Sequence, residues 1–400
     1  MELYSFTYSI PYILFLAYLI VLMFVEFRFI NQQKNIRNVR WATIIGFLFF
    51  FGLRGFVYTD WVNYHYYYQQ LSTIWQGGLL SVFSPQFLAP DTAVSIDFGF
   101  TLFSVLIKSL GANYFFWIFI NTFIDVLLLN AVFKRYSKYY VLCFIAFFAF
   151  GGIEIGFNLM RNIKAVLLFL LSLQYLQERK LLPYVLLNML GMCFHISSVL
   201  FLPLYFVLHR AYSKSFYWTI FAVGNVIFLF NIEYLQPMAN FCANLIGGRV
   251  PDMVHEYFRV GFSVNTFGFG YIERVLTFLL AMLFFRKLTQ QNSSNIIFIN
   301  LFILFFVCFF FFSEAVILSE RTALLFIAGY WVLYPNLYTL ISRVSNKKIV
   351  LMLFITFAMA KTIRNNHNIS CRYDNVLWGV QSYEERKQIL EETVEIFIRN

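Results

Sequence analysis

The chain has 400 residues, of which 60% are hydrophobic, 22% aromatic and 12% charged, and its formal net charge is +10. A soluble domain has about 25% charged residues, so this composition excludes an ordinary soluble protein. The apolar residues form long continuous blocks, whereas the strands of a transmembrane β-barrel alternate. The sequence therefore predicts an all-α polytopic membrane protein.

The excess of Lys and Arg has a simple explanation in a membrane protein. Basic residues are typical of short cytoplasmic loops, so the charge does not indicate a nucleic-acid partner. The five cysteines are scattered, with no CxxC motif and no Cys/His cluster. No metal site and no cofactor are predicted.

Apolar blocks separated by charged residues or by Gly, Pro and Asn predict about twelve transmembrane helices within residues 1–364. About 20 apolar residues are needed to cross a bilayer, so the apolar block at 98–110 is predicted to be a short or re-entrant helix. External loops are predicted at 58–97 and 233–268, and a C-terminal tail with a short amphipathic helix at 365–400. The predicted spans are 8–27, 41–57, 114–133, 139–157, 160–177, 181–194, 196–209, 215–232, 269–285, 295–313, 321–341 and 349–363.

Basic residues also predict the orientation of these spans. The segment 28–40 carries four of them and is expected to be cytoplasmic, with the N-terminus outside. The later basic loops fall inside only if 98–110 dips into the membrane and returns, and if 181–209 is a hairpin of two short helices that turns at His195. A single tilted span at 181–209 would invert everything after it, unless 98–110 also crossed.

The stretch FGLRGFVYTDWVNYHY places charges at the end of the second span. Arg54 lies at a helix end between two glycines, and Asp60 and Tyr64 follow at i, i+4 spacing. Ionisable residues at membrane depth are costly and usually face a cavity or a partner. Arg54 and Asp60 are therefore predicted to be functional, whereas the nearby tyrosines and tryptophan are typical of an interfacial belt.

Two further stretches place charges at helix ends. In SIDFGF, Asp97 is either the N-cap of the short helix or a functional carboxylate. In GGIEIGFNLMRNIKAVLLF, a break at 156–160 is expected, so that Arg161 and Asn162 open the next helix. A helix N-terminus with a guanidinium favours an anion, and the alternative is a structural pair between Glu154 and Arg161.

Three later stretches complete the set of unusual polar residues. His195, in GMCFHISSVLFLP, is either a hydrogen-bonded packing residue or a functional residue at the hairpin turn. In SEAVILSERTALLF, Arg321 is expected in the first turn of a helix, where a cation opposes the helix dipole; this indicates an anionic partner, either Glu320 or a substrate. The basic stretch KTIRNNHNISCRYDN, which includes Tyr373, suits anionic headgroups or the entrance of a site.

These residue types suggest one kind of chemistry. Three guanidiniums from separate spans suit a phosphate or pyrophosphate, because Arg presents a planar bidentate fork. Aromatic rings suit sugar faces, and a carboxylate near a hydroxyl suits a general base. Together they describe attack by a sugar hydroxyl on an anomeric carbon whose leaving group is a lipid-linked pyrophosphate.

The ordered set FGLRG…D…Y, IDFGF…LF, MRNIKAVLLFLLSLQYLQERKLLPYVLLNMLGMCFHISSVLFLPLYFVL, SERTALLF and YDNVLWG resembles the EpsG/Wzy group of O-antigen and exopolysaccharide polymerases. The likeness spans nearly the whole chain. It implies a GT-C-like polytopic glycosyltransferase of the bacterial inner (cytoplasmic) membrane. Such a protein joins undecaprenyl-pyrophosphate-linked repeat units at the periplasmic face, in lipopolysaccharide or other surface polysaccharide biosynthesis.

The resemblance also implies roles for the unusual residues. The implied pyrophosphate clamps are Arg54, Arg161 and Arg321. The implied catalytic residues are Asp60 or Asp97 as the base and His195 as a substrate-orienting residue. The group has Glu where this chain has Asp97, which leaves the choice of base open. Weaker substrate-binding candidates are Tyr64, Glu154, Asn162 and Tyr373. The implied partners are the lipid-linked donor and acceptor and a chain-length regulator.

Two alternatives belong to other classes of protein. A flippase for the same lipid-linked sugar would need cations accessible from both faces and inverted repeats, and the sequence shows neither. A membrane O-acyltransferase with His195 as its base would need a cytoplasmic entry for acyl-CoA, which the predicted topology lacks.

Overall fold

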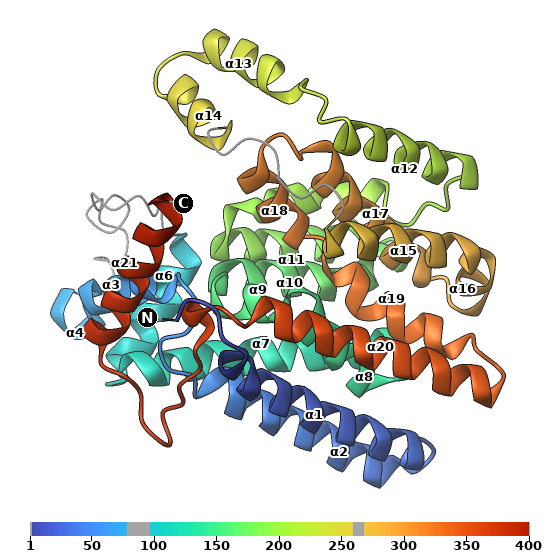
Figure 1. Cartoon of the computed structure of the whole chain (residues 1–400), viewed down its shortest axis with the longest axis horizontal. Helices are drawn as coiled ribbons and strands as arrows, with labels where there is room; N and C mark the ends of the chain where they lie inside the picture. The colour runs from blue at the N-terminus through green and yellow to red at the C-terminus, as the bar shows by residue number, and fades with distance from the viewer. Residues whose placement is uncertain (1, 78–96, 259–267, 400) are drawn as a thin grey trace. The chain divides into compact units, whose positions relative to one another are not determined.

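The computed structural model describes residues 2–77, 97–258 and 268–399 (Figure 1). Over these residues the regular structure is helical, with three isolated β-bridges and no strand. This confirms the predicted all-α fold class. The parts of the two predicted external loops at 78–96 and 259–267 lie outside the described residues.

The chain divides into two compact units. The larger unit comprises Met1–Tyr205 and Ser342–Asn400. Its helices are α1 (Phe6–Phe29), α2 (Gln33–Phe47), the π-helical turn η1 (Leu48–Gly52), α3 (Trp61–Gln70), α4 (Ile74–Gly77), α6 (Phe98–Ser109), α7 (Tyr114–Tyr136), α8 (Tyr140–Phe147), η3 (Phe148–Gly152), α9 (Ile153–Phe157), α10 (Met160–Gln177), α11 (Leu181–Phe194), the 3-10 helix η4 (Ile196–Phe206), α20 (Val344–Asn365), η5 (Ile369–Cys371) and α21 (Tyr383–Arg399). The predicted division of the chain at residue 364 stays a prediction.

The smaller unit comprises Phe206–Ile341. Its helices are α12 (Lys214–Leu229), α13 (Leu235–Ile246), α14 (Val250–Phe258), α15 (Phe269–Leu283), α16 (Phe285–Gln291), α17 (Asn295–Phe311), α18 (Val316–Leu324) and α19 (Ala328–Thr339). Helix α17 is almost wholly buried and packs against α12, α18 and α19. A carboxylate fixes the start of α13, because Glu314 accepts the N–H groups of Tyr234, Leu235 and Gln236.

Among the described residues, three helices are long and apolar enough to cross a membrane: Phe6–Phe29, Tyr114–Tyr136 and Tyr140–Phe157. The pair α18 and α19, bent by 54°, gives a fourth if it forms one broken span. Five further apolar helices are shorter. Each predicted span overlaps a helix, and the number of helices that cross the bilayer stays a prediction.

The predicted hairpin at 181–209 is confirmed by contacts between its two arms. The backbone at His195 is extended (φ −160°, ψ 127°), which ends α11 and reverses the chain. The Tyr184 hydroxyl donates to the carbonyl of Phe201 (2.5 Å), and its ring lies 5.1 Å from that of Tyr205. Helix η4 therefore runs back along α11.

Ends of the larger unit's long helices gather at the α1–α2 turn. The Glu26 carboxylate, near the end of α1, accepts the N–H groups of Tyr140 (2.9 Å) and Val141 (3.1 Å) at the start of α8. An ion pair between Arg135 and Glu178 (3.7 Å) joins the ends of α7 and α10. The predicted cytoplasmic loops that follow α1, α7 and α10 therefore lie at one end of this unit.

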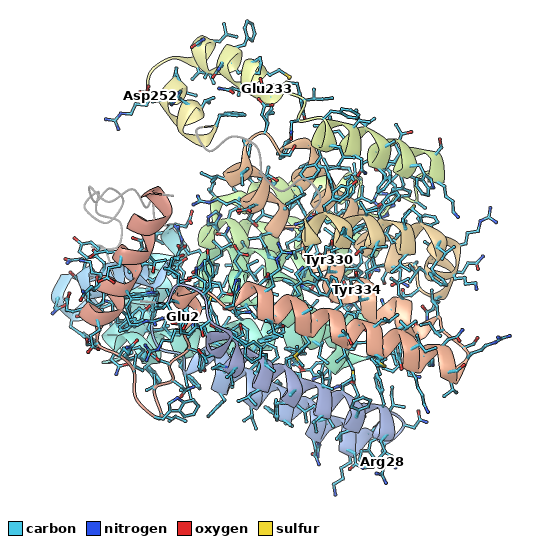
Figure 2. The ribbon with its side chains drawn as sticks, viewed as in Figure 1. Glu2, Arg28, Glu233, Asp252, Tyr330 and Tyr334 are labelled. Atoms are coloured by element: carbon cyan, nitrogen blue, oxygen red, sulfur yellow. The ribbon has the colours of Figure 1, made fainter. Side chains whose placement is uncertain are left out.

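Helix α20 also has its basic end at this end of the larger unit. The Ser9 hydroxyl in α1 donates to the carbonyl of Ile363 near the end of α20 (3.0 Å), so the two helices run in opposite directions. Figure 2 shows Glu2 and Arg28 at opposite ends of α1. The basic start of α20 consequently lies at the Arg28 end, together with the other basic loops of this unit.

Candidate functional site

The segment after η1 is held in place by the chain beyond α20. The N–H of Gly55 donates to the carbonyl of Asp374 (2.9 Å), and Arg54 forms an isolated antiparallel bridge with Asn375. The stretches FGLRG and YDNVLWG, far apart in the sequence, therefore lie side by side. This contact fixes the backbone from which the Arg54 side chain extends.

The Arg54 guanidinium lies inside the larger unit, with 4% of the residue exposed. Its hydrogen-bond partners are the Phe51 and Gly156 carbonyls, the Thr122 hydroxyl and the Met160 sulfur. The ring of Phe157 covers it at 4.6 Å. A guanidinium this buried acts on a surface anion through its charge: two unit charges about 10 Å apart interact by roughly 1.7 kcal/mol at an effective dielectric of about 20. Its role as a pyrophosphate clamp stays a prediction.

Asp97 connects three elements. It occupies the N-cap position of α6, but its side chain makes no cap hydrogen bond. One carboxylate oxygen lies 3.4 Å from Nη1 of Arg161 at the start of α10, and the other accepts the N–H of Ile196 (3.2 Å). Burial raises the pKa of Asp97, while the Arg161 charge opposes that shift. Because both side chains keep 16–17% exposure, this ion pair is within reach of a ligand.

His195 lies at the same place, one residue before Ile196. Its Nδ1 accepts the N–H of Ser197 (3.1 Å) and lies 2.7 Å from the Ser197 hydroxyl oxygen. Because Nδ1 is an acceptor, the neutral ring carries its proton on Nε2. The structure thus pairs Asp97 with Arg161 and places His195 next to this pair through the backbone of Ile196; all three residues were singled out from the sequence.

Two further candidates, Asp60 and Tyr64, lie at the start and in the first half of helix α3. Asn158, in the break between α9 and α10, accepts the N–H of Asp60 (3.3 Å) at the start of α3. The expected break at 156–160 is thereby confirmed. Arg161 lies within electrostatic range of the Tyr64 hydroxyl, whose pKa is raised chiefly by burial. Asp60 also lies within electrostatic range of Tyr64, so both α3 residues belong to the neighbourhood of Arg161.

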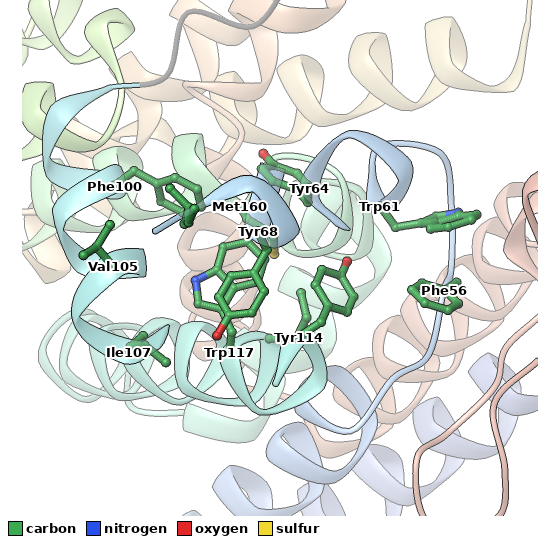
Figure 3. Packing of buried hydrophobic residues seen from close by; sticks show 12 residues of the cluster. Phe56, Trp61, Tyr64, Tyr68, Phe100, Val105, Ile107, Tyr114, Trp117 and Met160 are labelled. Carbon is green, nitrogen blue, oxygen red and sulfur yellow. The ribbon is translucent and has the colours of Figure 1, made fainter. Parts of the chain in front are cut away.

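An aromatic cluster supports these residues (Figure 3). Tyr64 and Tyr68 of α3 pack with Phe100 of α6 and Trp117 of α7, and the rings of Tyr68 and Trp117 stack at 4.9 Å. Next to Phe100, a Cβ added to Gly99 would lie 2.7 Å from the Cys193 carbonyl oxygen, so only Gly lets α6 approach α11 this closely. The IDFGF motif therefore combines a carboxylate, a close helix contact and a core ring.

The weaker candidates lie in different surroundings. Tyr373 donates to the carbonyl of Phe50 (2.7 Å) and stacks on its ring at 4.5 Å, so it is a packing residue near Arg54. Glu154 is exposed on α9, and Asn162 is partly exposed beside Arg161 on α10. The substrate-binding roles of these residues stay predictions.

The expectation for the helix at Arg321 was wrong. Helix α18 begins at Val316, so Arg321 lies in its last turn and is exposed. A cation near a helix C-terminus is favourable, which removes the dipole argument for an anionic partner. Arg321 belongs to the smaller unit, whereas Arg54 and Arg161 belong to the larger one. Whether the three guanidiniums share a site stays a prediction.

A buried ion pair below the site was missed in the sequence. Lys164 of α10 lies 3.2 Å from a carboxylate oxygen of Asp125 in α7, and both residues are at most 6% exposed. The signal was present, because a lone Asp in the apolar stretch INTFIDVLLLN is itself unusual at membrane depth.

Two more residues were missed. In the smaller unit, Glu273 of α15 is 3% exposed and lies within electrostatic range of Tyr330 of α19, which Figure 2 labels. In α21, Arg386 is buried and donates to the carbonyls of Phe56 (2.6 Å) and Arg372 (3.0 Å). Nothing in the charged tail sequence distinguishes Arg386 from its exposed neighbours. In the part of the chain that the structure describes, no three His, Cys, Asp or Glu residues are grouped to hold a metal.

Helices that are long and apolar enough to cross a bilayer indicate an α-helical membrane protein. A model of the EpsG family matches residues 39–376, and the protein belongs to the EpsG family. This confirms the resemblance stated from the motifs. The family places the chain among glycosyltransferase-like polymerases of the exopolysaccharide and O-antigen type, which act on lipid-linked oligosaccharides. No curated protein and no solved structure matches the chain.

Proposed function

We propose that the protein polymerises undecaprenyl-pyrophosphate-linked oligosaccharide repeat units at the periplasmic face of the bacterial inner membrane. The observation that carries this proposal is the Asp97–Arg161 pair, from the starts of α6 and α10, which binds the α11–η4 turn beside His195. A partly exposed cation, a carboxylate and an imidazole are the groups that glycosyl transfer from a pyrophosphate donor requires.

The reaction follows from this arrangement. The acceptor hydroxyl attacks the anomeric carbon of the donor, a new C–O bond forms, and the bond from that carbon to the pyrophosphate oxygen breaks. Arg161 stabilises the negative charge on the leaving pyrophosphate, an effect of roughly 3 kcal/mol for one well-placed donor. The hydroxyl proton passes to a carboxylate, Asp97 or Asp60. Because Asp97 is paired with Arg161 before substrate binds, an incoming pyrophosphate competes for Arg161 and frees the carboxylate.

The polarity of helix α10 supports a periplasmic site. Arg161 lies in its first turn, and the basic residues Arg179 and Lys180 follow its last turn. Eighteen helical residues extend about 27 Å, close to the thickness of the hydrocarbon layer. Since basic loops are enriched on the cytoplasmic side, Arg161 lies toward the other side in the proposed GT-C-like arrangement of about twelve spans. A chain-length regulator is the proposed protein partner.

A deletion strain tests the proposed function. Its surface polysaccharide, separated on a gel, should carry single repeat units and no ladder of longer chains, and the wild-type gene should restore the ladder. Complete loss of surface glycan would instead indicate a flippase, and long chains that lack acetyl groups would indicate an O-acyltransferase. An unchanged ladder in the deletion strain would contradict the proposal.

A further inference from the structure

An acidic and a basic side chain lie together one helical turn along α10 from Met160 and Arg161. The Lys164 ammonium is 3.2 and 3.3 Å from the two carboxylate oxygens of Asp125, and it also donates to the carbonyl of Met160 (3.2 Å). Met160 precedes Arg161, and its sulfur contacts Arg54. The pair is therefore linked through Met160 to both Arg54 and Arg161, the two arginines of the larger unit that are implied to bind pyrophosphate.

The contacts of Arg54 differ from those of Lys164 in one respect. Arg54 contacts two carbonyls, a hydroxyl, a thioether and an aromatic ring, all of them neutral. Among the described residues, no carboxylate forms an ion pair with it. Asp125 does lie within electrostatic range of Arg54, but its carboxylate is taken by Lys164.

We infer that Lys164 neutralises Asp125 and thereby keeps the positive charge of Arg54 available to an anionic substrate. Lys164 is a positioning residue in this inference, which rests on the proposed function. Without the Lys164 charge, Asp125 would face Arg54 as its nearest remaining counter-ion. Arg cannot shed its proton, so the carboxylate would pull the guanidinium away from the Phe51 and Gly156 carbonyls and cancel its charge.

The simpler possibility is that the pair only fastens α7 to α10. Removing one partner of a buried ion pair is strongly destabilising, whereas replacing both by neutral residues is often tolerated. The two explanations therefore predict different activities per molecule of folded protein. They also predict different rankings of the three variants by activity.

The experiment compares Lys164→Met, Asp125→Asn and the double variant Asp125→Asn/Lys164→Met. Each variant is measured for membrane level, for long-chain polysaccharide per unit of protein, and, after purification, for binding of inorganic pyrophosphate. Lys164→Met should lose at least tenfold in both activity and pyrophosphate affinity, because Asp125 then captures Arg54. Asp125→Asn and the double variant should both stay within about threefold of wild type, because neither retains a charge that competes for Arg54.

A matched control is the exposed pair Glu178–Lys180 at the end of α10, whose side chains are 43% and 61% exposed. Lys180→Met should leave both readouts unchanged. A double variant as impaired as Lys164→Met would overturn the inference. So would wild-type activity in Lys164→Met, losses that only follow membrane level, or no pyrophosphate binding by the wild-type protein. Failure of the proposed function has a different signature: the wild type would not extend lipid-linked units, while pyrophosphate binding would still rank the variants.

Discussion

The Asp97 carboxylate experiences two opposing influences. Burial favours its neutral form, and Arg161 at 3.4 Å favours its ionised form; the balance raises its pKa. A general base with a raised pKa takes up a proton more readily, which suits transfer from a sugar hydroxyl. Asp97 is therefore the base that we favour, because its raised pKa and its pairing with Arg161 are both seen at the proposed site.

The pH dependence of transfer tests this assignment. If Asp97 is the base it must be ionised, so activity should fall as the pH drops through its raised pKa, at a higher pH than for an ordinary aspartate. In the folded protein the raised pKa favours protonation, so the contribution of Asp97 to stability is present at low pH and is lost as the pH rises through that pKa. A pH–rate profile in proteoliposomes checks the first point. Asp97→Asn should abolish activity at every pH. Asp97→Glu should retain activity, and its rate should fall at a different pH than in the wild type.

Arg161 is predicted to contribute most of the pyrophosphate stabilisation. Arg161→Ala should lower transfer by about 10²–10³-fold, the range found when a single donor to a developing anion is removed. Arg161→Lys should recover part of the activity, since it restores charge but not the bidentate fork. Lys180→Ala at the other end of α10 is the control for loss of a cation. Full activity in Arg161→Ala with normal membrane level would contradict the proposed site.

At the scale of elements, the site depends on how closely α6 approaches the α11–η4 hairpin. A Cβ on Gly99 would lie 2.7 Å from both the Cβ and the carbonyl oxygen of Cys193. Gly99→Ala should therefore push α6 away, separate Asp97 from the Ile196 N–H, and cost about 1–3 kcal/mol in stability. Thermal unfolding in detergent measures the cost. Gly270→Ala is the control, because its new Cβ meets only the flexible end of Arg274.

The C-terminal helix is a second element on which the site depends. Arg386 holds the carbonyls of Phe56 and Arg372, and Tyr383 packs against Trp61 at 5.5 Å, so α21 braces the start of α3. Arg386→Met should leave these carbonyls without a donor and loosen α21. Limited proteolysis should then cleave the tail faster than in wild type, while Lys387→Met, which is exposed, should behave as wild type. Equal cleavage rates in the two variants would show that Arg386 does not anchor the helix.

At the scale of the whole molecule, the sequence predicted the helices better than the site. Apolar blocks bounded by charges located the helices, because bilayer thickness sets their length. The sequence singled out Asp97, Arg161 and His195 one by one but did not predict their contacts, since these depend on helix packing. Arg321 was misplaced because the start of α18 has no N-cap signal: Ala315 precedes it without a cap hydrogen bond. Asp125 and Lys164 were missed as a pair because their proximity arises only when α7 packs on α10.

Membrane orientation is the property on which the periplasmic assignment depends, and single-cysteine labelling tests it. The native exposed cysteines, Cys193 and Cys242, and the three buried ones are first replaced by Ala. Thr59→Cys, beside the site, should then react with a membrane-impermeant maleimide added to intact spheroplasts. Lys180→Cys, at the basic end of α10, should react only after the membrane is opened, because basic loops stay on the cytoplasmic side. The reverse pattern would place Arg161 on the cytoplasmic side. It would contradict the proposed reaction, which takes place at the periplasmic face.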